Sequence, residues 1–284
     1  MEYPMHTSMT SIKQTCRAAL MARARSLRWY PYKKTDPIIQ RALEIMPTSD
    51  LIYAAYISHR HRYLYINNPK TGGSSLKSAL VQLELKNLES DLDYYDWQVY
   101  QNKLIIPLST LNDLRHPTNF GSLLNNGYRF ITFVRNPYTR LLSCYRDKIL
   151  KKRAEKGKIL QFLGCDPSDM EAQITFEEFA KAVISQSDYD MDHHWRTQST
   201  QVLYGLLPYS FIGRFENYDK DFSDAFRIIG VNEDTAPELR HFNRTKSGPA
   251  EGCTDYYNPT LQAMVYDRYK ADFTNFGYSY DLPA

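Results

Sequence analysis

The sequence is poor in the features that mark several large classes of protein. Its 284 residues include only four cysteines, far apart and without a Cys-x-x-Cys pair, so neither a zinc site nor a disulfide framework is indicated. No stretch approaches the roughly 20 apolar residues that a membrane span needs. The formal net charge is only +3, which gives no electrostatic sign of a nucleic-acid partner. We therefore expect no metal, no nucleic acid and no integral membrane span.

The N-terminal part also lacks a signal-peptide pattern. Residues 1–35 carry several basic side chains but no continuous apolar segment. Together with the scattered cysteines, this predicts a cytoplasmic protein, with peripheral membrane contact through the basic N-terminus as the alternative to a packed or solvated extension. A short helix is expected over residues 37–45. No linker or repeat follows, so we divide the chain into an N-terminal extension (1–50) and one domain (51–284).

What the sequence does contain is a strand, a glycine loop and a helix in succession. Tyr63 to Ile66 is a short β-prone run, and an apolar stripe at helical spacing starts at Leu76. Such a turn aims backbone N–H groups and the positive end of a helix dipole at an anion. The two serines are expected to cap the helix. The candidate binding residues are Pro69, Lys70, Thr71, Gly72, Gly73, Ser74 and Ser75.

This loop does not follow the Walker A pattern of nucleotide-binding kinases and related proteins. In that pattern the lysine follows the last glycine, whereas Lys70 precedes both Gly72 and Gly73. A nucleotide-binding protein of another reaction class and an ordinary strand-to-helix turn both remain alternatives at this point.

A second strand–loop–helix follows in Tyr128 to Lys148. Phe130 to Val134 reads as a buried strand, and Arg135 stands at its carboxyl end. Asn136 and Pro137 are suited to the N-cap and first position of a helix. Arg135 thus places a permanently charged guanidinium at the end of a strand, which suits a phosphate. Ser143, two turns into the helix, offers a hydroxyl. The alternative is that Arg135 pairs with a carboxylate.

Together the two stretches resemble the sulfotransferases that use 3′-phosphoadenosine 5′-phosphosulfate (PAPS). Pro69–Ser75 is similar to their 5′-phosphosulfate loop, and Arg135–Ser143 to their 3′-phosphate motif, with arginine and serine eight residues apart. The resemblance implies a P-loop-like three-layer α/β sandwich, in which helices flank a central, mostly parallel sheet. It also implies PAPS as cofactor and 3′,5′-adenosine bisphosphate (PAP) as product.

Later segments resemble the carbohydrate branch of this family, which contains the chondroitin and dermatan 4-O-sulfotransferases. The His194-Trp195 pair, the strand around Phe211–Glu216 and the tail Asp272–Tyr278 are similar to segments of that branch. The sequence departs from this branch at two positions. Secretory-pathway members of the branch have cysteines there, whereas this chain has Val202 and Gly205. That departure supports the cytoplasmic assignment.

The resemblance implies transfer of a sulfuryl group to a carbohydrate hydroxyl. Lys70 would stabilise the leaving phosphate, the loop backbone would hold the 5′-phosphosulfate, and Arg135 with Ser143 would hold the 3′-phosphate. Arg244 and Lys246 could close over the nucleotide, although a solvated loop is an equal alternative.

The sequence offers several candidates for the general base. His194 is the first choice, because imidazole titrates near neutrality and the family has histidine there, with Asp190 or Asp192 to orient it. The other candidates are His193, His116 and Glu216, and a purely structural His-Trp pair is the alternative. A non-catalytic glycan-binding module on the same scaffold is the second rival function.

Overall fold

The chain folds around a four-stranded sheet. The computed structural model describes residues 36–86, 108–111, 119–232, 234, 236–239 and 252–283. Its strands are β1 (Ala55–Ser58), β2 (Tyr63–Ile66), β3 (Arg129–Val134) and β4 (Phe211–Arg214), in the order β1-β2-β3-β4. β1 is antiparallel to β2, and the other two pairings are parallel. The predicted α/β fold with a central, mostly parallel sheet is confirmed, although β1 was not foreseen.

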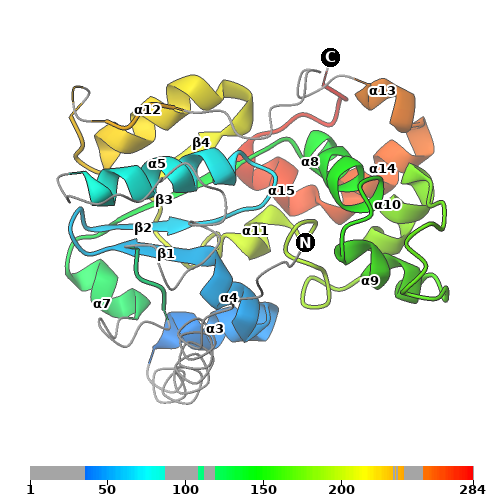
Figure 1. The fold of residues 1–284 in the computed structure, drawn as a ribbon, viewed down its shortest axis with the longest axis horizontal. Coiled ribbons are helices and arrows are strands. Elements are labelled where there is room, and N and C mark those ends of the chain that lie inside the picture. Colours follow the sequence, from blue (N-terminus) through cyan, green and yellow to red (C-terminus); the bar gives the residue numbers. More distant parts are fainter. Residues whose placement is uncertain are drawn as a thin grey trace, which may run out of the picture.

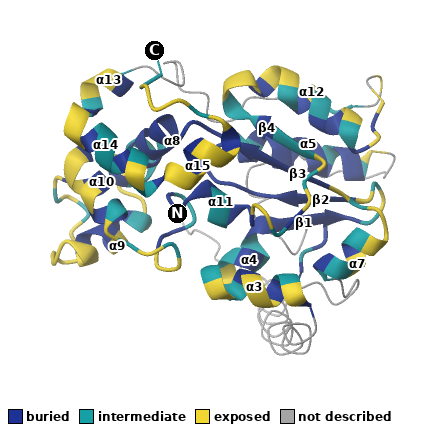
Figure 2. Ribbon diagram, turned by 180° about the vertical axis from the view of Figure 1, so that it is seen from behind, coloured by how far each residue is buried: buried dark blue, intermediate teal, exposed yellow. Residues whose placement is uncertain are grey.

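Side-chain alternation along the strands divides the core into two layers. Tyr63 and Tyr65 pack toward α5 (Gly73–Leu85) and α12 (Tyr218–Ile228). Leu64 and Ile66 face the opposite layer, because successive side chains of a strand point to opposite faces. β1, β2 and β3 from Phe130 onward are buried on both faces (Figure 2), whereas β4 is half-buried except at Gly213. This is expected of a sheet whose inner strands are covered on both sides.

The layer on the other face comes from the N-terminal helices and one later helix. These are α3 (Pro37–Ile45), α4 (Thr48–Ala54) and α7 (Phe120–Asn125), which lie below the sheet in Figure 1 while α5 and α12 lie above it. The helix expected over residues 37–45 is confirmed, and its buried face joins the core of the sheet.

A second body of helices stands beside the sheet (Figure 1) and has a hydrophobic cluster of its own. It comprises α8 (Pro137–Cys144), a π-helical turn (Tyr145–Ile149), α9 (Glu155–Phe162), α10 (Phe176–Ile184), α13 (Cys253–Tyr256), α14 (Pro259–Arg268) and α15 (Lys270–Phe276). The short α11 (Gln198–Gln201) and a 3₁₀ turn (Phe215–Asn217) complete the elements used below.

Local sequence signals set where these helices begin. The Asn136 side chain accepts a hydrogen bond from the Tyr138 N–H, and Pro137 occupies the first position of α8. Asn258 and Pro259 start α14 in the same way. Such a start is favourable, because the asparagine side chain accepts from a backbone N–H that has no partner within the helix. The proline that follows has no N–H and therefore requires no acceptor.

Candidate functional site

The loop between β2 and α5 takes its shape from a left-handed backbone at Gly72. This residue has φ of 81° and is the N-cap of α5. The Tyr218 hydroxyl donates to the Gly72 carbonyl at 2.7 Å, and a Cβ at position 72 would stand 2.3 Å from the Tyr218 ring. Both the dihedral angle and the close ring therefore require glycine here.

The predicted capping by the two serines is wrong. Gly72 precedes the helix, so Ser74 and Ser75 lie inside its first turn, and no side chain caps this end of α5 within the described chain. The physical reason is that the left-handed glycine starts the helix earlier than the hydroxyls would. A helix start without a side-chain cap presents its first N–H groups and its dipole to an anion.

Arg135 brings the second motif into contact with the first. Its Nη1 donates to the Lys70 carbonyl at 3.2 Å and its Nε to the Thr139 hydroxyl at 3.0 Å. The guanidinium also stacks over the Phe215 ring, 4.3 Å from its centroid. Burial lowers the pKa of Arg135 to about 10, which still leaves it charged at neutral pH. The structure thus places the two predicted phosphate motifs side by side.

A buried amide ties the two strand ends together. Gln198 Oε1 accepts from Asn68 Nδ2 and from the Arg135 N–H, both at 2.9 Å, while Gln198 Nε2 donates to the Arg135 carbonyl at 2.7 Å. Gln198 is held in turn by the buried carboxylate of Asp272, which accepts from its N–H at 2.7 Å. Sequence reasoning missed both roles, because a lone glutamine carries no local signal.

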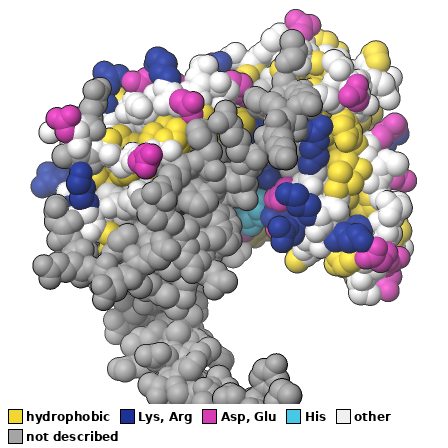
Figure 3. Space-filling view, turned by 45° about the horizontal axis from the view of Figure 1, so that its top comes forward, with side chains coloured by type: hydrophobic (Ala, Val, Ile, Leu, Met, Phe, Trp, Pro, Cys, Tyr) yellow, Lys and Arg dark blue, Asp and Glu magenta, His cyan; other side chains and the backbone are white. Residues whose placement is uncertain are grey.

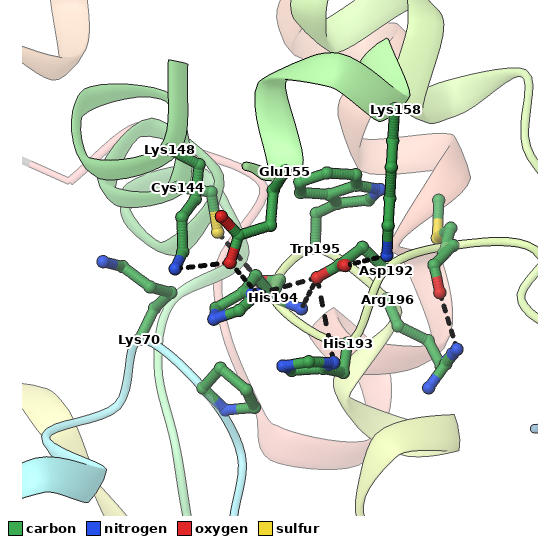
Figure 4. Close-up of polar contacts among 12 residues, drawn as sticks. Lys70, Cys144, Lys148, Glu155, Lys158, Asp192, His193, His194, Trp195 and Arg196 are labelled. Atoms are coloured by element: carbon green, nitrogen blue, oxygen red, sulfur yellow. Dashed lines mark hydrogen bonds and ion pairs between the residues drawn. The ribbon is translucent and has the colours of Figure 1, made fainter. Parts of the chain in front are cut away.

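The Lys70 side chain leads into a row of charges on the helical body (Figure 4). Its Nζ lies 3.0 Å from Asp147 Oδ2. Lys148 follows, 3.8 Å from the same Asp147 oxygen and 2.7 Å from Glu155 Oε1. Glu155 Oε1 is 3.5 Å from His194 Nδ1. Alternating charges therefore connect the loop lysine to the candidate base.

Asp192 orients His194. It is one of the two carboxylates, Asp190 and Asp192, that the sequence suggested for this role. Asp192 Oδ1 accepts from the His194 backbone N–H at 3.0 Å and lies 2.7 Å from its Nδ1. Lys158 Nζ donates to the other oxygen at 2.6 Å. Asp190 instead accepts from the Ser187 hydroxyl. With Nδ1 engaged by Asp192, Nε2 is the nitrogen of His194 left to exchange a proton.

Burial and charge shift the pKa values of this group. Burial lowers the pKa of His194, and the Asp192 hydrogen bond only partly offsets it. His193 stacks on His194 with ring centroids 4.2 Å apart, and burial followed by that neighbour lowers its pKa to about 4. Burial alone would raise the pKa of Asp192, but the two histidines and Lys158 together lower it. Both imidazoles are therefore neutral at pH 7.

Arg140 joins the loop to the histidine segment, and sequence reasoning missed it. Its side chain is almost fully buried. Nε donates to the Pro69 carbonyl at 3.0 Å, Nη1 to the Arg196 carbonyl at 2.8 Å, and Nη2 to the His193 carbonyl at 3.3 Å. One guanidinium thus sets the distance between the segment that carries Lys70 and the segment that carries the histidines.

The remaining predicted residues have different outcomes. Ser143 lies half-buried near the end of α8, and its role stays a prediction. Glu216 accepts from the Asn136 N–H at 2.7 Å and the Tyr278 hydroxyl at 2.9 Å, which are structural contacts. His116, Arg244 and Lys246 lie outside the described residues, as does the basic N-terminus over 1–35.

Asp192, His193 and His194 are also the residues of the described chain whose spacing would suit a metal ion, with ligand atoms within 4.8 Å of one another. However, both Asp192 oxygens already serve His194 and Lys158, so the carboxylate is engaged in orienting the imidazole. In Figure 3 a histidine side chain is visible at the surface beside acidic side chains and side chains of the lysine or arginine type.

Comparison with known proteins agrees with this geometry. The model of the sulfotransferase family matches residues 53–279. The chain is 23% identical to carbohydrate sulfotransferase 11 of Danio rerio over 84% of its own length and 70% of the relative's. It is 26% identical to carbohydrate sulfotransferase 8 of Mus musculus over 79% of its length, although it spans only 56% of that relative. The search of solved structures gives no match.

A further relative is carbohydrate sulfotransferase 14 of Danio rerio, 25% identical over 90% of this chain and 70% of the relative. The resemblance to the carbohydrate branch that the motifs indicated is thereby confirmed.

The cytoplasmic assignment is wrong. The relatives are carbohydrate sulfotransferases, the branch whose secretory-pathway members carry the two cysteines noted above. The missing cysteines do not identify a compartment: of the residues at the two matching places, Val202 is fully buried in the core beside the sheet and Gly205 is exposed. Among the described residues, no helix is long and apolar enough to cross a membrane.

Proposed function

Because the chain belongs to the sulfotransferase family, we propose that it moves a sulfuryl group from PAPS to a hydroxyl of a carbohydrate acceptor. The observation that carries the proposal is the contact between the two motifs. Lys70 and Arg135 follow neighbouring parallel strands and are joined by the bond from Arg135 Nη1 to the Lys70 carbonyl. One nucleotide can therefore be held at its two phosphate ends by residues of a single sheet edge.

On the donor side, the Pro69–Ser75 backbone would hold the 5′-phosphosulfate at the uncapped start of α5. Arg135 and Ser143 would hold the 3′-phosphate. Lys70 would meet the charge that develops on the bridging oxygen and the leaving phosphate, which is the kind of electrostatic stabilisation that dominates phosphoryl transfer. Asp147, whose Oδ2 lies 3.0 Å from the Lys70 Nζ, would hold that side chain in place before the nucleotide binds.

On the acceptor side, His194 would act as the general base. The acceptor oxygen forms a bond to sulfur while the bond from sulfur to the phosphate oxygen breaks, and the hydroxyl proton passes to His194 Nε2. Asp192 holds the ring by its bond to Nδ1 and stabilises the imidazolium that forms. Because the pKa of His194 is lowered by burial, the ring is already in its basic form at neutral pH.

Ligand-dependent melting separates this proposal from a kinase. PAP should raise the melting temperature more than ATP with magnesium does, because a ligand that binds only the folded state stabilises it and Arg135, beside the loop, offers a partner for the 3′-phosphate. A larger shift with ATP and magnesium would contradict the proposal.

Transfer of labelled sulfate to a panel of glycans separates an enzyme from a glycan-binding module. We expect incorporation that depends on PAPS and falls by about 10²–10³-fold in Lys70→Ala. Binding of glycans without any transfer, in protein that also binds PAP, would favour the module.

A further inference from the structure

Two adjacent imidazoles and a carboxylate converge on one point in the histidine segment. Asp192 Oδ1 lies 2.7 Å from His194 Nδ1 and 3.9 Å from His193 Nδ1 (Figure 4). The ligand atoms of the three side chains all lie within 4.8 Å of one another. Because the three residues are consecutive, one short piece of backbone brings these donor atoms together.

The distances are close to those of a tetrahedral zinc site. Zinc bonds to nitrogen and oxygen of about 2.0–2.2 Å place two ligand atoms of a tetrahedron about 3.3–3.6 Å apart. One of the two distances at Asp192 Oδ1 is shorter than this and the other is longer, so shifts of about 0.6 Å in each would seat the ion. Two imidazoles and a carboxylate also suit Zn²⁺, whereas Mg²⁺ and Ca²⁺ prefer oxygen ligands.

The cations around this cluster bind the carboxylate oxygens other than those nearest the imidazoles. Lys158 Nζ pairs with Asp192 Oδ2 at 2.6 Å. Asp50 Oδ1 is 3.9 Å from His193 Nδ1, whereas Arg196 pairs with Asp50 Oδ2 at 2.7 Å. A second carboxylate therefore adds negative charge beside the same nitrogen. A metal ion could enter on the Oδ1 side without breaking either of these ion pairs.

We propose that Asp192, His193 and His194 form a zinc site that inhibits the reaction. The ion takes Oδ1 of the carboxylate and Nδ1 of each ring, and it replaces the proton between Asp192 and His194. Glu155 Oε1 is 3.5 Å from His194 Nδ1 but is paired with Lys148 at 2.7 Å, so water is the fourth ligand. Three protein ligands with a water in the fourth position are a common zinc coordination.

The inhibition follows from where His194 carries its proton. In the base, Nδ1–H faces Asp192, and Nε2 is left to accept a proton from the acceptor hydroxyl. Zinc binds an imidazole nitrogen through its lone pair, so at Nδ1 it displaces the proton, and the neutral ring then carries its proton on Nε2. Such a ring donates from Nε2 and cannot act as the base. This inhibition rests on the proposed function, whereas zinc binding does not.

The test is a binding measurement that needs no turnover. Protein that has been freed of metal and saturated with PAP competes for zinc with a chromophoric indicator, and magnesium is the control ion. The variant is His193→Gln, which removes one ligand and leaves the contact between Asp192 and His194. His61→Gln is the matched control, because His61 precedes β2 whereas the loop that Arg140 joins to the histidine segment follows it.

We expect the unmodified protein and His61→Gln to bind one zinc ion per chain, and magnesium not to compete. His193→Gln should bind zinc about 10²-fold or more weakly, because the loss of a residue that only orients a ligand already costs about 10–100-fold. Asp192→Asn serves as the second variant if His193→Gln no longer folds and binds PAP.

Zinc should also lower the rate of sulfate transfer over the concentration range in which it binds. PAP affinity should stay unchanged, because neither Lys70 nor Arg135 is a ligand of the ion. The rate that His193→Gln retains should not respond to zinc in that range.

The zinc site is overturned if the unmodified protein binds no zinc, or if zinc binding keeps its full strength in His193→Gln. A transfer rate that is unchanged with the site filled would overturn the inhibition. The proposed function fails separately. Absence of sulfate transfer to any glycan, with zinc binding that depends on His193 intact, would refute the transferase and leave the metal site standing.

Discussion

The edge of the sheet and the helical body hold their parts of the site by different means. Lys70 and Arg135 follow β2 and β3, where hydrogen bonds of the backbone and a left-handed glycine fix the chain. His194 instead stands in a segment held by charged side chains: Asp192 binds its ring, Lys158 binds Asp192, and Arg140 binds two carbonyls of the segment.

This difference matters for both stability and chemistry. A backbone-built cradle varies little with pH, because peptide groups do not titrate in the accessible range. A network of carboxylates and imidazoles titrates, so its geometry and its charge depend on pH. The donor side should therefore behave as a fixed receptor, and the base side as the part that sets the pH dependence of the reaction.

The largest expected effect comes from the base. His194→Gln should lower kcat by about 10²–10⁴-fold, the usual contribution of a general base, with PAP affinity unchanged. In the unmodified protein the rate should fall as the pH drops through the pKa of His194, because only the neutral ring accepts a proton. Burial lowers that pKa, so the fall should lie below the ordinary value of 6.5. Rate profiles over pH 4.5–8 for both proteins measure this fall, which should be about one decade in rate per pH unit on the acid side.

His193→Gln is the matched control, since the two rings are neighbours but only His194 bonds Asp192 at 2.7 Å. A larger loss in His193→Gln than in His194→Gln would reverse the assignment of the base.

The next effect tests the donor side. Lys70→Ala should lower kcat by about 10²–10³-fold, because one positioned charge on the leaving group is removed, and the shape of the pH profile should stay the same. Lys151→Ala is the control: this exposed lysine is 3.7 Å from Asp147 but does not belong to the loop. Equal losses in the two variants would mean that general charge, and not the Lys70 position, determines the rate.

The same contrast explains what could be predicted from sequence. The Gly72 turn, the Asn136 cap and Pro137 are local signals, because each concerns residues within a few positions of one another. These signals located the loop, α8 and the strand ends correctly. The serine caps were wrong because the left-handed glycine, whose place depends on the distant Tyr218 ring, starts α5 early.

Long-range side-chain contacts left no such signal. Gln198 reaches Asn68 across 130 positions of sequence, and Arg140 reaches the Pro69 carbonyl across 71. Their partners are mostly backbone atoms, which every residue offers, so no pairing of residue types reveals them. His194 could be named only through the resemblance to a family, and its Asp192 partner only as one of two nearby carboxylates.

A smaller effect should follow from loosening the connection between the two regions. Arg140→Lys keeps the charge but cannot reach three carbonyls, so kcat should fall by up to about 10²-fold through misplacement of the reacting groups. The free energy of unfolding should fall by about 1–3 kcal/mol for each carbonyl left without a donor. Denaturation in urea and kinetics with both substrates measure the two consequences.

Positioning by Arg140 predicts a particular signature. Both PAP affinity and kcat should decline, because the residue contacts the Pro69 loop and the histidine segment. Destabilisation with normal kinetics, measured at a temperature where the variant is fully folded, would reduce Arg140 to a purely structural residue.

The smallest effect should come from Lys158, at the outer end of the histidine network. Its side chain is 63% exposed, so its ion pair with Asp192 is screened and Lys158→Ala should change the free energy of unfolding by only about 0–1 kcal/mol. The pKa of Asp192 is lowered partly by this pair. The stability that the pair contributes is therefore present above the unfolded pKa of the Asp192 carboxyl and is lost as the pH falls through the folded pKa.

Without Lys158, Asp192 stabilises the imidazolium of His194 more strongly. The acid side of the rate profile should therefore move slightly toward higher pH while the maximal rate stays constant, and an unmoved profile would show that Asp192 orients His194 without tuning its charge.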